Sequence, residues 1–173
     1  MASTSDMLVV QFEGPREWAA WLEQHHAAST GVWLRLARKA SGIASVTYDQ
    51  ALEVALCYGW IDGQKKSHDQ ASWLQKFTPR GARSIWSKIN REKAELLIER
   101  GAMMPAGLAA VVPDDFQAAL DQSPAALAFF ATLSSRNRYA LLFRIQTAKK
   151  AETRARRIEQ FIRMLAKHET LYP

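Results

Sequence analysis

The sequence predicts an α+β protein: a small antiparallel sheet packed with helices, followed by a helical C-terminal part. Three observations predict this class. The stretches that resemble strands lie before residue 80, the chain after Pro79 shows helical spacing, and 173 residues suffice for about one domain. We therefore expect an α+β part over residues 1–112 and a helical part over residues 113–173, joined in one compact unit.

The first residues predict a strand, a helix and a second strand. Residues 7–12 are apolar and β-branched, which is typical of a strand. Gly14 and Pro15 end it, and Pro15 is well suited to open a helix. The apolar side chains of that helix recur every three or four positions: Trp18, Trp21, Leu22 and His25. Residues 32–38 alternate well enough to predict a half-buried strand.

A further helix and a hairpin are predicted next. Thr47 and Gln50 form a capping box at the start of the helix, and Gly59 suits the position just after its end. Asp62-Gly63 is a turn signal, and residues 71–77 predict a strand. Two strands around a polar turn predict a β-hairpin at this point.

The rest of the chain is predicted to be helical. Asn90 is the expected N-cap of a helix over residues 91–100. Further short helices are expected to begin at Pro105, Pro113 and Ser123. Residues 137–148 and 153–168 are expected to form two helices or one broken helix.

Composition favours a soluble, cytoplasmic protein. The chain is 48% hydrophobic and 23% charged, and its one cysteine excludes a disulfide framework within it. The N-terminus lacks the regions of a signal peptide, and no uncharged apolar run reaches the ~18–20 residues that span a bilayer. The net charge of +6 is uneven, because residues 136–173 hold ten Lys and Arg against three Glu.

Sequence patterns for metal binding or catalysis are not found. None of the four histidines is paired with another at the four-residue spacing that helical zinc sites use. The sequence has no nucleophile elbow, P-loop or dinucleotide fingerprint. Cys57 lies on the apolar side of its expected helix, where a buried small hydrophobe is the favoured interpretation. We expect no metal and no cofactor.

Two unusual stretches suggest a candidate binding pocket. In the first stretch, Gly59 to Lys66, a tryptophan and an acid follow the end of the expected helix, and functional residues often lie at such junctions. Its Asp62 either caps a turn, or stays ionised to bind a polar ligand or serve as a base. The second stretch, Phe77 to Arg80 followed by Ser84 to Asn90, mixes cations, hydroxyl groups and an aromatic ring. This mixture suits phosphate or nucleobase binding. It equally suits a tryptophan in the core beside polar residues that cap a helix. The candidate pocket comprises Trp60, Asp62, Lys65, Arg80, Ser84, Trp86 and Ser87.

The C-terminal helices carry a candidate basic surface. Its members are Lys149, Lys150, Arg154, Arg156 and Arg157. Such a surface attracts nucleic acid or an anionic membrane at low salt, although arginine side chains on the outer face of a helix often contact only solvent. No known nucleic-acid-binding motif accompanies the charge.

Several blocks resemble the YdeI/OmpD-associated family, whose members are also described as bacteriocin-protection proteins. The blocks are Ala51 to Gly63, Phe77 to Arg80, Ser84 to Asn90, Met104 to Leu108 and the tail Ala148 to Ile158. The resemblance covers most of the chain from about Phe12 onward. One difference is that family members usually continue with a Gly-Arg-Trp segment, whereas here Val112 leads directly to Pro113.

The resemblance implies a bacterial protein connected with envelope stress, bacteriocin tolerance and an outer-membrane porin, without established catalytic residues. Our leading hypothesis is a non-enzymatic, cytoplasmic binding or stress-protection protein. The expected partners are an envelope or stress-related protein or a small anionic ligand. Two alternatives stay open. One is a nucleic-acid-binding protein that uses the C-terminal helices, and the other is an enzyme with Asp62 as general base and Arg80 as anion clamp.

Overall fold

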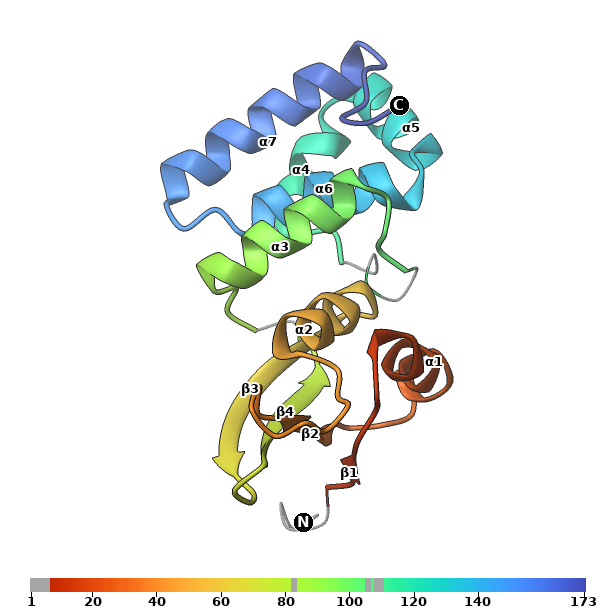
Figure 1. Cartoon of the computed structure of the whole chain (residues 1–173). Coiled ribbons are helices and arrows are strands. Elements are labelled where there is room, and N and C mark those ends of the chain that lie inside the picture. Colours follow the sequence, from red (N-terminus) through yellow and green to blue (C-terminus); the bar gives the residue numbers. More distant parts are fainter. Residues whose placement is uncertain (1–6, 82–83, 105–106, 108–110) are drawn as a thin grey trace. The chain divides into compact units, whose positions relative to one another are not determined.

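The computed structural model describes residues 7–81, 84–104, 107 and 111–173, which divide into two compact units (Figure 1). The first unit ends at Ile85 and contains the sheet with two helices. The second begins at Trp86 and is helical. The α+β class and the helical C-terminal part are thus confirmed.

The sheet of the first unit has the strand order β1-β2-β4-β3. Three strands are antiparallel neighbours as predicted, β2 (Val32–Ala37), β4 (Ser72–Pro79) and β3 (Trp60–Ser67). The short β1 (Val9–Val10) runs parallel to β2, so the sheet is mixed rather than antiparallel throughout. The reason is the helix between β1 and β2, because a crossover helix returns the chain in the same direction.

Two helices, α1 (Pro15–His25) and α2 (Tyr48–Cys57), pack on this sheet (Figure 1). Trp18 of α1 is fully buried, and its ring centroid lies 5.7 Å from that of Phe77 on β4. Its indole N–H donates to the carbonyl of Ala51 at 3.1 Å. A single tryptophan therefore connects α1 to both α2 and the sheet.

Local signals in the sequence fix both ends of α2. The hydroxyl of Thr47 accepts a hydrogen bond from the backbone N–H of Gln50, whose side chain accepts from the N–H of Thr47. This is the predicted capping box. Gly59 has a φ of 74°, the left-handed conformation that suits the residue after a helix end.

The hairpin is confirmed, but the predicted turn at Asp62-Gly63 is wrong, because β3 continues through both residues. The register on β4 shifts between Asp62 and Lys65, where β3 contains one extra residue and forms a β-bulge. A bulge leaves backbone carbonyls without a cross-strand partner. The buried amide of Gln75 donates to the carbonyls of Gly63 (2.8 Å) and Gln64 (3.2 Å), which satisfies them.

The chain turns at residues 68–71 instead, and Asp69 organises this turn. One carboxylate oxygen of Asp69 accepts hydrogen bonds from the N–H groups of Ala71 (2.8 Å) and Ser72 (2.6 Å). The other oxygen lies 2.8 Å from the guanidinium of Arg35. The hydroxyl of Ser72, which also donates to this carboxylate, and the charge of Arg35 hold the pKa of Asp69 below its ordinary value.

The second unit consists of helices in its described part. They are α3 (Lys88–Glu99), α4 (Asp114–Asp121), α5 (Pro124–Thr132), α6 (Ser135–Gln146) and α7 (Ala151–Ala166). The predicted N-cap of α3 at Asn90 is wrong, because the Ser87 hydroxyl accepts the N–H of Asn90 at 3.1 Å and the helix begins three residues earlier. The helix predicted from Pro105 lies mostly outside the described residues.

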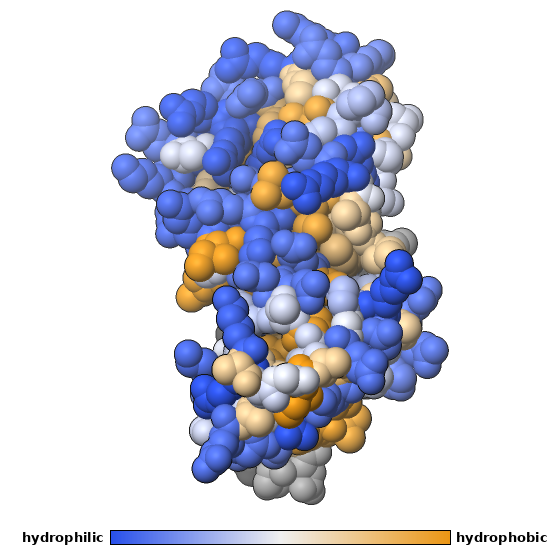
Figure 2. Space-filling model, viewed as in Figure 1, coloured by the Kyte–Doolittle hydropathy of each residue, from blue (hydrophilic) through white to orange (hydrophobic). Residues whose placement is uncertain are grey.

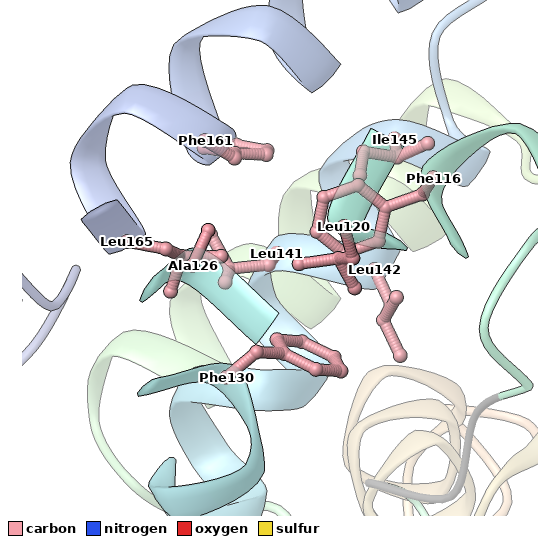
Figure 3. Close-up of a cluster of buried hydrophobic side chains, with 9 residues drawn as sticks. All are labelled: Phe116, Leu120, Ala126, Phe130, Leu141, Leu142, Ile145, Phe161 and Leu165. Carbon is pink, nitrogen blue, oxygen red and sulfur yellow. The ribbon is translucent and has the colours of Figure 1, made fainter. Parts of the chain in front are cut away.

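Buried side chains from four helices form the core of this unit (Figure 3). They are Phe116, Leu120, Ala126, Phe130, Leu141, Leu142, Ile145, Phe161 and Leu165. The rings of Phe116 and Phe130 meet edge to face with centroids 5.5 Å apart. On α7 the core residues Phe161 and Leu165 are four positions apart and share one face. Among the described helices of the chain, none is long and apolar enough to cross a membrane.

Candidate functional site

Trp60 belongs to the core of the first unit rather than to an open pocket. Its side chain is 1% exposed and meets the rings of Trp18 and Trp21 edge-on, at 6.5 and 6.1 Å between centroids. Its indole N–H donates to the carbonyl of His26 at 3.3 Å. A ring in this setting stabilises the fold and is shielded from a ligand.

Asp62 is half-buried on β3 and accepts a hydrogen bond of 2.7 Å from the hydroxyl of Tyr48. Burial and this hydrogen bond raise the pKa of Tyr48 above its ordinary value, so the phenol stays protonated at neutral pH. A general base needs an oxygen within reach of the proton that it removes. Because one carboxylate oxygen holds the phenol, this geometry favours an anchoring role for Asp62.

Three further candidate residues of the first unit are spread along its surface. Lys65 is exposed on β3, beyond the bulge. Arg80 follows β4, and its backbone N–H donates to the carbonyl of Gly59 at 2.8 Å, which places it beside the start of β3. The hydroxyl of Ser84 accepts the N–H of Gly81 at 2.9 Å. The backbone therefore brings Arg80 close to the strand end that carries Trp60, while Lys65 lies farther along β3.

The last two candidate residues belong to the second unit. The ring of Trp86 meets that of Phe143 edge to face, with centroids 4.7 Å apart. Ser87 caps α3 through its hydroxyl. These are packing and capping roles, and the convergence of all seven candidate residues on one pocket stays a prediction.

An open hollow of about 390 Å³ lies in the second unit, next to the loop before α7; we name it the loop hollow. Its lining comprises Arg91, Glu92, Glu95, Thr147, Ala148, Lys149, Lys150, Thr153 and Arg157. Four cations thus face two carboxylates, and Glu92 also lies 3.7 Å from the ammonium of Lys88. The side chain of Lys150 does not cap α7, so the first-turn amides of α7 add positive partial charge.

Two residues of the predicted basic surface hold helices together. Arg154 on α7 donates to the carboxylate of Asp115 on α4 at 2.6 and 2.8 Å, and to the carbonyl of Ile145 on α6 at 3.0 Å. These bonds and the charge of Arg154 hold the pKa of Asp115 below its ordinary value. Arg157 donates to the carbonyl of Arg144. The exposed members of the basic surface are Lys149, Lys150 and Arg156. Hydrophilic residues cover most of α7 on the face shown in Figure 2.

A larger groove of about 590 Å³ runs along α4 and α7. Its lining includes Ala119, Ala155 and Ile158 together with the ion pair of Arg154 and Asp115. Since these two charged groups are already bonded to each other, the groove presents mainly apolar surface and paired charge.

A further hollow of about 320 Å³ lies near the turn of the β3–β4 hairpin; we name it the hairpin hollow. Its lining comprises Arg38, Lys65, Lys66, Ser67 and Trp73. Of this set, only Lys65 belongs to the candidate pocket expected from the sequence. The other residues were missed because strand pairing, rather than proximity in the sequence, brings them together. The adjacent Lys65-Lys66 pair opposite a strand that contains Trp73 is the signal that could have found them.

Groups suited to metal binding or nucleophilic catalysis are not assembled in the described structure. Among the described residues, no three His, Cys, Asp or Glu side chains are grouped so that they could hold a metal ion. Burial raises the pKa of the Cys57 thiol to about 11, so this group stays protonated near neutral pH. The ring nitrogens of His25 and His26 hydrogen-bond backbone carbonyls of α1 at 2.8 Å.

The fold and its hollows define a class: an α+β protein with a helical C-terminal unit and cation-lined surface hollows. Residues 10–110 match the family model described as a domain of unknown function, DUF8412. This match covers more than half of the chain, and the chain therefore belongs to that family. Residues 109–168 match the family model described as "Bacteriocin-protection, YdeI or OmpD-Associated". The searches found no matching curated protein and no matching solved structure.

The two matches meet at residues 109–110. The tail from Ala148 to Ile158 lies within the second match, which confirms the resemblance to YdeI/OmpD-associated proteins over residues 109–168. The four blocks between Ala51 and Leu108 lie within the first match. The loop before α7 therefore lies in the region that matches the bacteriocin-protection model, and the β3–β4 hairpin lies in the region that matches DUF8412.

Proposed function

We propose that this chain is a non-enzymatic binding protein of the bacteriocin-protection type, and that its C-terminal domain binds a small anion in the loop hollow. The observation that carries the proposal is the lining of this hollow by four cations. Three of them, Lys149, Lys150 and Arg157, lie within residues 109–168, which match the bacteriocin-protection family. A cytoplasmic location and an envelope or stress-related protein partner stay predictions.

The chemistry of the hollow suits an anion that carries several oxygens. Lys149 and Lys150 are exposed on the loop, while Arg91 and Arg157 are half-buried beside them. The hydroxyl of Thr153 and the first-turn amides of α7 supply neutral donors at the same place. Charge-assisted hydrogen bonds from several donors to one phosphate-like group are among the stronger polar interactions in proteins.

The loop hollow favours a small anion over a nucleic acid. A duplex or a long single strand needs a row of exposed cations along its backbone. On α7 this row is interrupted at Arg154, because its guanidinium is bonded to the carboxylate of Asp115. The enzyme alternative has less support, since Asp62 holds the hydroxyl of Tyr48.

Calorimetric titration with inorganic phosphate and pyrophosphate tests the proposed binding. Relative to the unmodified chain, the double variant Lys149→Gln, Lys150→Gln is expected to lose about tenfold or more in affinity, because it removes two charge-assisted contacts. The matched control is Arg163→Gln, Lys167→Gln, which removes the same charge near the other end of α7 and should bind as the unmodified chain does.

Two outcomes would contradict the small-anion proposal. One is equal loss of affinity in both double variants, which would indicate a general charge effect. The other is binding to short duplex DNA that is far tighter than binding to pyrophosphate and falls steeply with salt, which would favour the nucleic-acid alternative.

Survival of bacterial cells exposed to a bacteriocin tests the protective function itself. Cells that produce the unmodified chain are expected to survive better than cells without it, and the Lys149→Gln, Lys150→Gln variant is expected to lose that advantage at equal protein level. Protection that persists in full in this variant would separate the function from the loop hollow.

A further inference from the structure

The register of the sheet places the hairpin-hollow residues on one face. Trp73 on β4 pairs with Leu36 on β2 and with Ser67 on β3. Because side chains alternate along a strand, Arg38 shares the face of Leu36, and Lys65 shares the face of Ser67. The half-buried indole of Trp73 therefore lies between two cations. The guanidinium of Arg38 follows the end of β2, and the ammonium of Lys65 lies on β3.

The indole of Trp73 is held in place from the side of α2. Its ring centroid lies 6.1 Å from that of Tyr48, with the planes inclined by 41°. Tyr48 is itself fixed by its 2.7 Å hydrogen bond to Asp62. A ring that is packed on one side and faces a hollow on another provides a preformed stacking surface, which lowers the conformational entropy that binding costs.

The charges around the indole are positive. Arg38 and Lys65 are exposed, and within the described part of the chain no hydrogen bond or ion pair holds either side chain. Lys66 differs, because its ammonium lies 4.2 Å from the ring centroid of Trp33. None of the described residues that line the hollow is acidic, and the nearby carboxylate of Asp69 is bonded to Arg35 and to the turn.

The backbone beneath the hollow is fixed by polar contacts on both sides. The amide of Gln75 satisfies the bulge that precedes Lys65, and Asp69 organises the turn that follows Ser67. The N–H of Arg38 donates to the carbonyl of Ala71 at 2.8 Å, which holds the end of β2 beside the same turn. The hollow is thus built on paired strands rather than on a long loop.

We infer that the hairpin hollow is a binding site for a nucleoside monophosphate. The planar base stacks on the indole of Trp73, and the phosphate lies between the guanidinium of Arg38 and the ammonium of Lys65. The volume of about 320 Å³ suits one small ligand. Stacking on an aromatic side chain and charge-assisted bonds to phosphate are the two interactions that this lining offers together. The site is separate from the loop hollow and does not depend on the function proposed for it.

Calorimetric titration with three probes separates the two interactions. Adenosine 5′-monophosphate carries base and phosphate, adenosine lacks the phosphate, and ribose 5-phosphate lacks the base. The unmodified chain is expected to bind the nucleotide about tenfold or more tightly than either of the other probes. Failure to detect nucleotide binding at about 1 mM would overturn the proposal.

Matched variants locate the binding. Trp73→Leu is expected to lower nucleotide affinity about tenfold and leave ribose 5-phosphate unchanged, since it removes only the stacking surface. Trp33→Leu, on the opposite face of the sheet, is its control and should bind normally. Lys65→Gln and Arg38→Gln are expected to weaken both phosphate probes, with Lys76→Gln as their control. Equal losses in Trp33→Leu and Trp73→Leu would contradict the site.

Two checks keep these results interpretable. Near-ultraviolet circular dichroism establishes that each variant is folded, and Trp73→Phe, which retains a ring, should keep more nucleotide affinity than Trp73→Leu. The Lys149→Gln, Lys150→Gln variant should bind the nucleotide with unchanged preference over ribose 5-phosphate. A loss of that preference in this variant would place the nucleotide in the loop hollow and overturn the inference.

Discussion

The two units use their positive charge in different ways. In the second unit, arginines donate to backbone carbonyls in the last turn of neighbouring helices, as Arg136 does to Ile98 (2.9 Å) and Arg154 does to Ile145 (3.0 Å). In the first unit, Arg38 and Lys65 are exposed around a hollow. The number of basic residues in a segment therefore does not show how much positive charge that segment exposes. The C-terminal helices contain most of the excess charge, but a substantial part of it connects helices.

The cores of the units differ as well. The first is built around indole and phenyl rings, with Trp18 in contact with Trp21, Trp60 and Phe77 at 5.6–6.5 Å between centroids. The second combines leucines with the rings of Phe116, Phe130 and Phe161 (Figure 3). The first core also contains polar bonds, such as that from Trp18 to the carbonyl of Ala51, whereas the nine core residues of the second are all apolar.

Truncating one central ring in each unit should have the largest effect on stability. Trp18→Ala and Phe116→Ala each remove a fully buried ring and are expected to lower the free energy of unfolding by about 3–5 kcal/mol. Trp18→Ala is expected to lie at the upper end, because it also leaves the carbonyl of Ala51 without its partner. Urea denaturation measures both values. A clearly smaller loss for Trp18→Ala would show that this hydrogen bond adds nothing to the ring.

Replacing Gln75 should have an intermediate effect, confined to the first unit. Gln75→Leu fills a similar volume but leaves the carbonyls of Gly63 and Gln64 without their donor, at an expected cost of about 1–3 kcal/mol. Hydrogen exchange should show faster opening of β3 near Lys65, with α7 unchanged. If Gln75→Leu left the free energy of unfolding unchanged, water would satisfy the two carbonyls of the bulge equally well.

Removing the ion pair of Asp115 and Arg154 should have the smallest effect, and it depends on pH. Their side chains are 48% and 28% exposed, so solvent screening limits the contribution of the pair to about 0–1 kcal/mol. Because the folded pKa of Asp115 is lowered, this contribution is present at neutral pH and disappears as the pH falls through the folded pKa.

Asp115→Asn should therefore be slightly less stable than the unmodified chain at pH 7, and equally stable once the pH falls below the lowered pKa of Asp115. Urea denaturation at a series of pH values measures this difference. Arg163→Gln, which breaks the more exposed pair with Glu159, serves as the comparison and should change little. A difference for Asp115→Asn that persists in acid would point to lost packing rather than lost charge.

Features that depend on near neighbours in the sequence could be predicted. The capping box of Thr47 and Gln50 and the left-handed Gly59 are satisfied by residues only a few positions apart, and both occur as expected. The Asp62-Gly63 signal, in contrast, is ambiguous because its near neighbours do not decide its structure. A glycine between strand-like residues marks either a turn or a bulge, and the distant side chain of Gln75 decides for the bulge.

The candidate site was harder to predict because it depends on partners far apart in the sequence. Asp62 looks available in the sequence, yet Tyr48, fourteen residues earlier, donates to it. Arg154 looks like a surface cation, yet Asp115 and Ile145 bind it. The reverse holds for Trp73, which reads as an ordinary strand residue and lies in a cationic hollow only because β4 is the central strand between β2 and β3.

The bulge in β3 and the amide that satisfies it also have an evolutionary consequence. A relative in which β3 is one residue shorter would have a regular ladder, and a buried amide at the position of Gln75 would then lack carbonyls to bind. Selection would favour an apolar residue there. The extra residue in β3 and the glutamine are therefore expected to be inherited together. The residue at the position of Gln75 then indicates whether a family member has the bulge in its β3–β4 hairpin.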